Sequence, residues 1–259
     1  MKRFFRYTLL SALALILIIL SYSLITYWIL FSPNENFPYH LEYNEFNIRS
    51  DEPIEENLIQ KLDSVTIRLA SVLDYDKGVY QIYLCNNPKT YGIFSRKVGK
   101  PINTQGFNIQ PLNHIFINVS FVKEMKSRNN SGFKYHIIEG DLSHLIAHEI
   151  CHQLIAGRIG FIRMRNVDSW KLEGYCEYSA SKHIKEIDVS YSFGDFVTDF
   201  FGGQFYNIST GRKFYIESLI ITEYYLDYKN KSFIDLVNDN IDKEKLLQEI
   251  KRRNQAESL

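Results

Sequence analysis

Residues 141–157 read Asp-Leu-Ser-His-Leu-Ile-Ala-His-Glu-Ile-Cys-His-Gln-Leu-Ile-Ala-Gly. The run is rich in apolar residues and contains few helix breakers, so it predicts a buried helix. Either Asp141 or Ser143 can cap the start of this helix, and Gly157 can close its end. The sequence therefore predicts one central helix that carries several polar side chains into the interior.

The polar residues of this helix follow the pattern His-Glu-x-x-His. His148 and His152 are four residues apart, which places both imidazoles on one helical face. One zinc ion can be held by both rings, at about 2.0–2.1 Å from each nitrogen. Glu149 projects from nearly the same face and is well placed to activate a water molecule. We therefore expect His148 and His152 to bind Zn²⁺ and Glu149 to act as general base.

A catalytic zinc site needs a third protein ligand and one open position. Residues 170–178 read Trp-Lys-Leu-Glu-Gly-Tyr-Cys-Glu-Tyr and leave room for a loop and a returning helix. Glu173, Glu177 and Asp168 are the candidate ligands. Glu177 has a second interpretation, because a carboxylate one turn away can hydrogen-bond a ligand histidine instead.

The same segment resembles a known family. Trp170, Glu173, Gly174 and Tyr178 fit the Trp-x-x-Glu-Gly-x-Ala-x-Tyr type of motif, so the chain resembles the gluzincin metallopeptidases of the peptidase MA-like superfamily. The resemblance implies that Glu173 is the third zinc ligand and that the fold is zincin-like. Two departures stand out: the histidine-to-glutamate spacing is slightly longer than in thermolysin-like members, and the Gly-x-Met-Glu-Asn motif of aminopeptidases is absent from the sequence.

The resemblance extends to the segment from Tyr215 to Leu226. Related domains often have a tyrosine here that faces the metal, which implies that Tyr215 donates a hydrogen bond to the developing oxyanion. Tyr178 is the next candidate for this role. His144 lies one turn before His148, and we expect it to support a ligand rather than to bind the metal.

The N-terminus predicts a membrane anchor. Residues 7–31 are almost continuously apolar and long enough to cross a bilayer. Basic residues lie in segment 1–6, whereas acidic residues dominate just after the apolar stretch, so the positive-inside rule places residues 1–6 in the cytoplasm. A cleaved signal peptide is the alternative, but no Ala-x-Ala-like site follows. We expect a single-pass cell-membrane protein with an extracytoplasmic domain.

Composition limits the partners. Thirty basic and thirty acidic residues give a formal charge of zero, and no basic cluster stands out, so nucleic acid is not predicted as a partner. The expected partners are a peptide or protein substrate and the membrane, with the oligomeric state left open. Cys85, Cys151 and Cys176 do not form a disulfide framework. A Cys151–Cys176 disulfide is one hypothesis, and buried thiols packed between two helices are the other.

The predicted fold class is α+β. We expect a zincin-like fold with a small mixed sheet, the active-site helix and a mainly helical C-terminal half, in addition to the transmembrane helix. Segment 32–52 is predicted as a linker and 53–259 as the metallopeptidase domain. Residues 114–119 are predicted as the edge strand that binds extended substrate through its backbone. The other elements predicted are strands 79–85 and 106–109 and helices 88–98 and 243–253.

The function expected from these features is that of a membrane-anchored zinc metallopeptidase. The alternative is a catalytically inactive zinc-binding domain that recognises a cell-envelope partner. The presence of Glu149 favours the enzyme, because a purely structural zinc site needs no general base. A structural anchor protein without metal is the third hypothesis.

Overall fold

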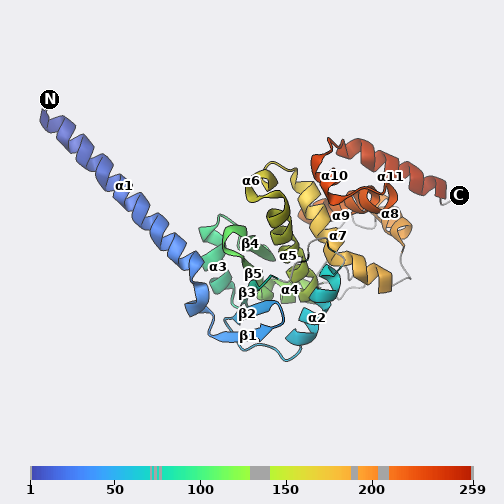
Figure 1. Cartoon of the computed structure of the whole chain (residues 1–259), viewed down its shortest axis with the longest axis horizontal. Helices are drawn as coiled ribbons and strands as arrows, with labels where there is room; N and C mark the ends of the chain where they lie inside the picture. Colours follow the sequence, from blue (N-terminus) through green and yellow to red (C-terminus); the bar gives the residue numbers. More distant parts are fainter. Residues whose placement is uncertain are drawn as a thin grey trace.

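The chain is mostly helical, with one small sheet and a long N-terminal helix that projects from the body (Figure 1). The computed structural model describes residues 2–70, 72, 75, 78–128, 141–187, 192–203 and 210–257. Helix α1 (Lys2–Phe31) contains the segment Leu10–Trp28, which is apolar and long enough to cross a membrane. An α+β fold with a small sheet and an apolar N-terminal helix was predicted, and this much is confirmed.

The sheet has five strands in the order β1-β2-β3-β5-β4. The first two strands form an antiparallel hairpin, whose turn is closed by Asn44 at a φ of 50°. The pairs β2–β3 and β3–β5 are parallel, and β4 pairs antiparallel with β5. The strands are β1 (Tyr39–Tyr43), β2 (Phe46–Ser50), β3 (Tyr80–Cys85), β4 (Gly106–Ile109) and β5 (His114–Asn118).

Two sequence-based expectations about the sheet need correction. Residues 39–50 fall within the predicted linker, yet they form β1 and β2 and belong to the sheet. Residues 114–118 form β5, which is an interior strand and not the predicted edge strand. The reason is that β4 covers the outer side of β5, with Phe107 opposite Phe116. The edge nearest the predicted metal helix is therefore β4.

Helices cover both faces of the sheet. Alternate residues of a strand point to opposite faces, and the pairs Ile82–Leu84 and Tyr83–Cys85 of β3 accordingly enter two different buried clusters. The aromatic cluster on one face packs against α3 (Pro88–Lys97). The aliphatic cluster on the other face packs against α2 (Leu58–Leu69) and the long central helix. The aliphatic face of the sheet thus packs in one cluster with both the central helix and α2.

That central helix is α5 (Leu142–Ile159), and it is buried around most of its circumference. Its N-cap is Asp141, whose side chain accepts a hydrogen bond of 3.0 Å from the backbone N–H of Ser143. The sequence suggested that this helix ends at Gly157, but the helix is longer. It continues to Ile159 and ends at Gly160, whose φ of 83° suits a residue without a side chain.

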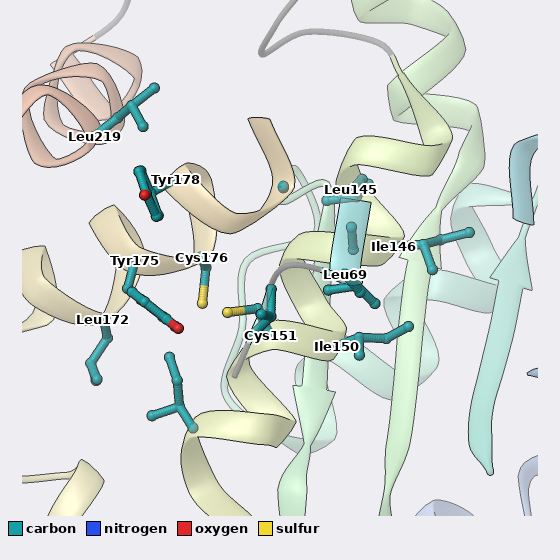
Figure 2. Close-up of a cluster of buried hydrophobic side chains, with 14 of the residues drawn as sticks. Leu69, Leu145, Ile146, Ile150, Cys151, Leu172, Tyr175, Cys176, Tyr178 and Leu219 are labelled. Atoms are coloured by element: carbon teal, nitrogen blue, oxygen red, sulfur yellow. The ribbon is translucent and has the colours of Figure 1, made fainter. Parts of the chain in front are cut away.

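Helix α7 (Ser169–Ile187) packs against α5 on one side and α9 (Thr210–Glu223) on the other. The approach to α9 is close at Gly174, because a methyl group there would overlap the Thr222 hydroxyl and the Ser218 carbonyl. Figure 2 shows the apolar contact between α5 and α7, in which the sulfur atoms of Cys151 and Cys176 face each other. Both thiols are free and buried, in agreement with the packing hypothesis.

The remaining elements are mostly short helices, some between the strands and the others in the C-terminal half. They are η1 (Pro33–Asn36), η2 (Gln110–Leu112), α4 (Val119–Arg128), α6 (Phe161–Met164), α8 (Phe193–Phe201), the π-helical η3 (Tyr224–Tyr228), α10 (Phe233–Asn238) and α11 (Lys243–Glu257).

Candidate metal centre

Three predicted ligand residues meet between α5 and α7. The Nε2 atoms of His148 and His152 lie 3.2 Å apart, and Oε2 of Glu173 lies 3.2 Å from the first and 3.3 Å from the second. These donor atoms form a nearly equilateral triangle. Tetrahedral zinc with bonds of about 2.0–2.1 Å separates its donors by about 3.3 Å, so the triangle has the dimensions of one face of such a site. The residues present therefore fit a zinc ion.

Glu177 lies behind this triangle, one turn further along α7. Its Oε1 is 2.9 Å from Nδ1 of His148, in ion-pair contact without the alignment of a directed hydrogen bond. Its Oε2 lies 3.2 Å from Nε2 of His144. Glu177 therefore contacts the side of His148 that faces away from Glu173. This is the position from which a carboxylate orients a ligand histidine.

A second donor set is also close enough to hold an ion. Sγ of Cys176 lies within 4.8 Å of ligand atoms of His148 and His152. We favour Glu173 over Cys176 for two reasons. The Cys176 sulfur faces Cys151 in the apolar contact between the helices (Figure 2), and this side chain is fully buried. The Glu173 side chain instead retains 23% exposure.

The electrostatics of the site couple the carboxylates to the imidazoles. Burial alone disfavours charge on His148, but the adjacent Glu173 and Glu177 carboxylates prevail and raise its pKa well above the ordinary value. Burial would likewise raise the pKa of Glu177, yet His144 and His148 hold it well below its usual range. The pKa of Glu173 is lowered, against the effect of burial, by His152 and His148. Buried charges of this kind are tolerated only when they are paired or bind a cation.

Glu149 is buried beside the triangle and faces the edge strand. Its Oε2 accepts a hydrogen bond of 3.0 Å from Nδ2 of Asn108 on β4. Gly106 allows this approach, because a methyl group at that position would lie 3.1 Å from Oε1 of Glu149. The carboxylate is therefore held between α5 and the edge strand β4.

Of the other candidates, Tyr215 lies near the donor triangle, whereas Tyr178 and Asp168 make contacts elsewhere. Tyr215 on α9 lies next to the triangle, with its ring centroid 6.1 Å from that of His148. Burial and the nearby Glu173, Glu149 and Glu177 carboxylates raise its pKa, so its hydroxyl keeps its proton. Tyr178 donates a hydrogen bond of 2.6 Å to Asp227, away from the triangle. Asp168 is 64% exposed, and its carboxylate lies 3.7 Å from the Lys171 ammonium.

Two features of the site were not predicted from the sequence. No role was predicted for Asn108, although a polar residue in a short strand near the predicted metal helix could have indicated a contact with that helix. The contact between His144 and Glu177 was also missed. Both depend on how separate elements pack, and the spacing of residues along the chain does not encode that packing.

A scan against protein-family models and a search of curated proteins find no match to this chain.

Proposed function

We propose that the chain is a membrane-anchored zinc metallopeptidase of the gluzincin type, with a zincin-like fold. The observation that supports this most strongly is the donor triangle of His148, His152 and Glu173, with the Glu149 carboxylate beside it. His148, His152 and Glu173 would hold zinc, which supplies Lewis acidity to polarise the scissile carbonyl and to favour ionisation of water.

The protein groups around the site suit the proton transfers of peptide hydrolysis. Glu149 takes a proton from the attacking water and delivers it to the nitrogen of the leaving amine. Asn108 donates to Oε2 of Glu149, so Oε1 would remain available to accept the water proton. Tyr215, with its proton retained, donates a hydrogen bond to the substrate oxyanion.

The edge strand β4 suits an extended peptide. In the described part of the chain β4 pairs with β5 alone, so its other edge offers free backbone groups. A peptide added there would be held by main-chain hydrogen bonds with little dependence on its sequence. Because Asn108 of β4 contacts Glu149, a peptide on this edge would lie close to the general base.

The proposed location is the cell membrane. The segment Leu10–Trp28 would span the bilayer once. The basic residues in segment 1–6 favour a cytoplasmic N-terminus and an extracytoplasmic catalytic domain.

The test is cleavage of a peptide library by the detergent-purified full chain. We expect Glu149→Gln to lower turnover by about 100- to 10,000-fold, since general acid–base catalysis contributes that much. Glu35→Gln changes an exposed carboxylate on η1 and serves as the matched control. Wild-type turnover in Glu149→Gln would refute the mechanism, and a wild-type chain that binds zinc but cleaves nothing would favour the inactive zinc-binding domain.

A further inference from the structure

Helix α1 joins the folded domain without a spacer. The carbonyl oxygen of Leu30, one residue before the end of α1, lies 2.9 Å from Nδ1 of His114 on β5. Phe37, six residues after the end of α1, is fully buried against Tyr83, Phe94 and other rings of the aromatic cluster. The domain is therefore held directly at the end of α1, as Figure 1 shows.

Helix α3 lies alongside the final turns of α1. The Lys97 ammonium at the end of α3 sits 4.9 Å from the ring centroid of Tyr22. Tyr22 is nine residues before Phe31, which corresponds to about 13 Å along a helix. Tyr22 falls inside the apolar segment Leu10–Trp28, so α3 would lie near the membrane boundary if that segment spans the bilayer.

The length of α1 agrees with this placement. Its 30 residues extend about 45 Å, close to the roughly 40–45 Å thickness of a bilayer with its headgroups. The last turns carry Tyr22, Tyr27 and Trp28, the residue types that gather where hydrocarbon meets headgroups. The end of α1 and the adjacent α3 would thus occupy the headgroup layer.

The outer face of α3 suits that layer. Lys89, Ile93, Arg96 and Lys97 recur at helical spacing on the side opposite the buried Tyr91 and Phe94. Lys100 and Ile102 extend this surface beyond the helix, and Ile102 covers Gly92. Lys89, Arg96, Lys97 and Lys100 have no carboxylate partner among the described residues.

The part of the chain that contains α3 carries basic but no acidic side chains. The sequence contains no aspartate or glutamate between Asp76 and Glu124, whereas six lysines and arginines fall in that interval. The zero net charge of the whole chain conceals this asymmetry. A surface that combines basic residues with exposed isoleucines is typical of segments that lie in a membrane interface.

We propose that the outer face of α3, together with Lys100 and Ile102, binds anionic phospholipid headgroups. These headgroups belong to the leaflet that contains the C-terminal end of α1. The basic side chains contact lipid phosphates, and Ile93 and Ile102 enter the boundary between headgroups and acyl chains. This inference rests on the proposed membrane span of α1 and is independent of the metal site. It gives the domain a second attachment, which fixes its orientation against the bilayer.

The experiment uses the full chain in phospholipid vesicles with a fluorescent label on one introduced cysteine. The three native cysteines are buried, so labelling is selective for Ile93→Cys. Ile67→Cys on α2 is the matched control, because the two isoleucines are 45% and 47% exposed. Quenching by nitroxide-bearing phospholipids reports contact with lipid, and vesicle flotation reports insertion of α1.

With phosphatidylglycerol present, we expect strong quenching at position 93 and little at position 67. Replacing Lys89, Arg96, Lys97 and Lys100 with Gln should reduce quenching toward the control, since each basic residue near an anionic surface strengthens attraction on the order of fivefold. Equal quenching at positions 93 and 67 in floating vesicles would overturn the proposal. So would equal quenching at 93 in pure phosphatidylcholine. A chain that does not float with the vesicles would instead refute the membrane span itself.

Discussion

Asn108 on β4 donates a hydrogen bond of 3.0 Å from its Nδ2 to Oε2 of Glu149 on α5. Hydrogen bonds to charged groups are worth about 1.5–3 kcal/mol, and this one holds the proposed general base in place. We predict that Asn108→Ala lowers kcat about tenfold to hundredfold and leaves the zinc content unchanged. Steady-state kinetics and metal analysis measure both quantities. Asn103→Ala is the control, because Asn103 is exposed on the preceding loop; equal kcat values in the two variants would contradict the role of Asn108.

Glu177 lies 2.9 Å from Nδ1 of His148 and should orient that ring toward the metal. We predict that Glu177→Gln weakens zinc binding about 10- to 100-fold, the usual effect of losing such a partner. Competition with a chromophoric chelator measures the affinity. Glu217→Gln removes a carboxylate that pairs with Lys243 on another part of the chain, and it should bind zinc as the wild type does. If both variants keep wild-type affinity, Glu177 has no part in holding His148.

Gly174 brings α7 against α9, and a methyl group there would overlap the Ser218 carbonyl and the Thr222 hydroxyl. We predict that Gly174→Ala lowers the free energy of unfolding by about 1–3 kcal/mol, as overpacking does. Gly157→Ala on α5 is the matched control, since no atom lies within 4 Å of the added methyl group. That change should instead stabilise by about 0.5–1 kcal/mol. Chemical denaturation of the full chain in detergent distinguishes the two signs, and destabilisation by neither variant would contradict the close packing.

Asp141 caps α5 and pairs with the buried Arg68 across 2.6 Å. Burial would raise the pKa of Asp141, but Ser143 and Arg68 prevail and lower it. A carboxylate with a lowered pKa stabilises the fold above its unfolded pKa of about 3.9, and this contribution is lost as the pH falls through the lower folded value.

We therefore predict that Asp141→Asn is less stable than wild type at pH 7 and that the difference shrinks as the pH falls below about 4. Asn caps a helix about as well as Asp, so the loss at neutral pH should come from the charge that pairs with the buried Arg68. Urea unfolding across this pH range measures it. A difference that stays constant with pH would show that the charge of Asp141 does not contribute.

The local elements of the fold were largely predictable. Strands 79–85 and 106–109 and helix 88–98 were predicted within one residue of their ends, because apolar alternation, Pro88 and the glycine at 106 mark their boundaries. The central helix followed from its apolar run, and Asp141 proved to be the cap among the two candidates. These signals are local, and the sequence carries them directly.

The arrangement of the elements was less predictable. The edge position of β4 depends on its pairing with β5, and strand order leaves no local trace in the sequence. The hairpin of β1 and β2 falls in a predicted linker because the segment just before it, with Pro33, Asn34, Asn36 and Pro38, resembles loop composition. The meeting of Glu173 with His148 and His152 agrees with the family resemblance, whereas Asn108 reaches Glu149 only through tertiary packing.

In the proposed function, His148, His152 and Glu173 bind one zinc ion. The most direct test is the zinc content of the purified full chain after dialysis against a chelator, compared between Glu173→Ala and Cys176→Ala. We predict about one zinc per chain in the wild type and in Cys176→Ala, and loss of zinc in Glu173→Ala, since Glu173 completes the donor triangle. Zinc retained in Glu173→Ala and lost in Cys176→Ala, or absent from the wild type, would contradict the claim.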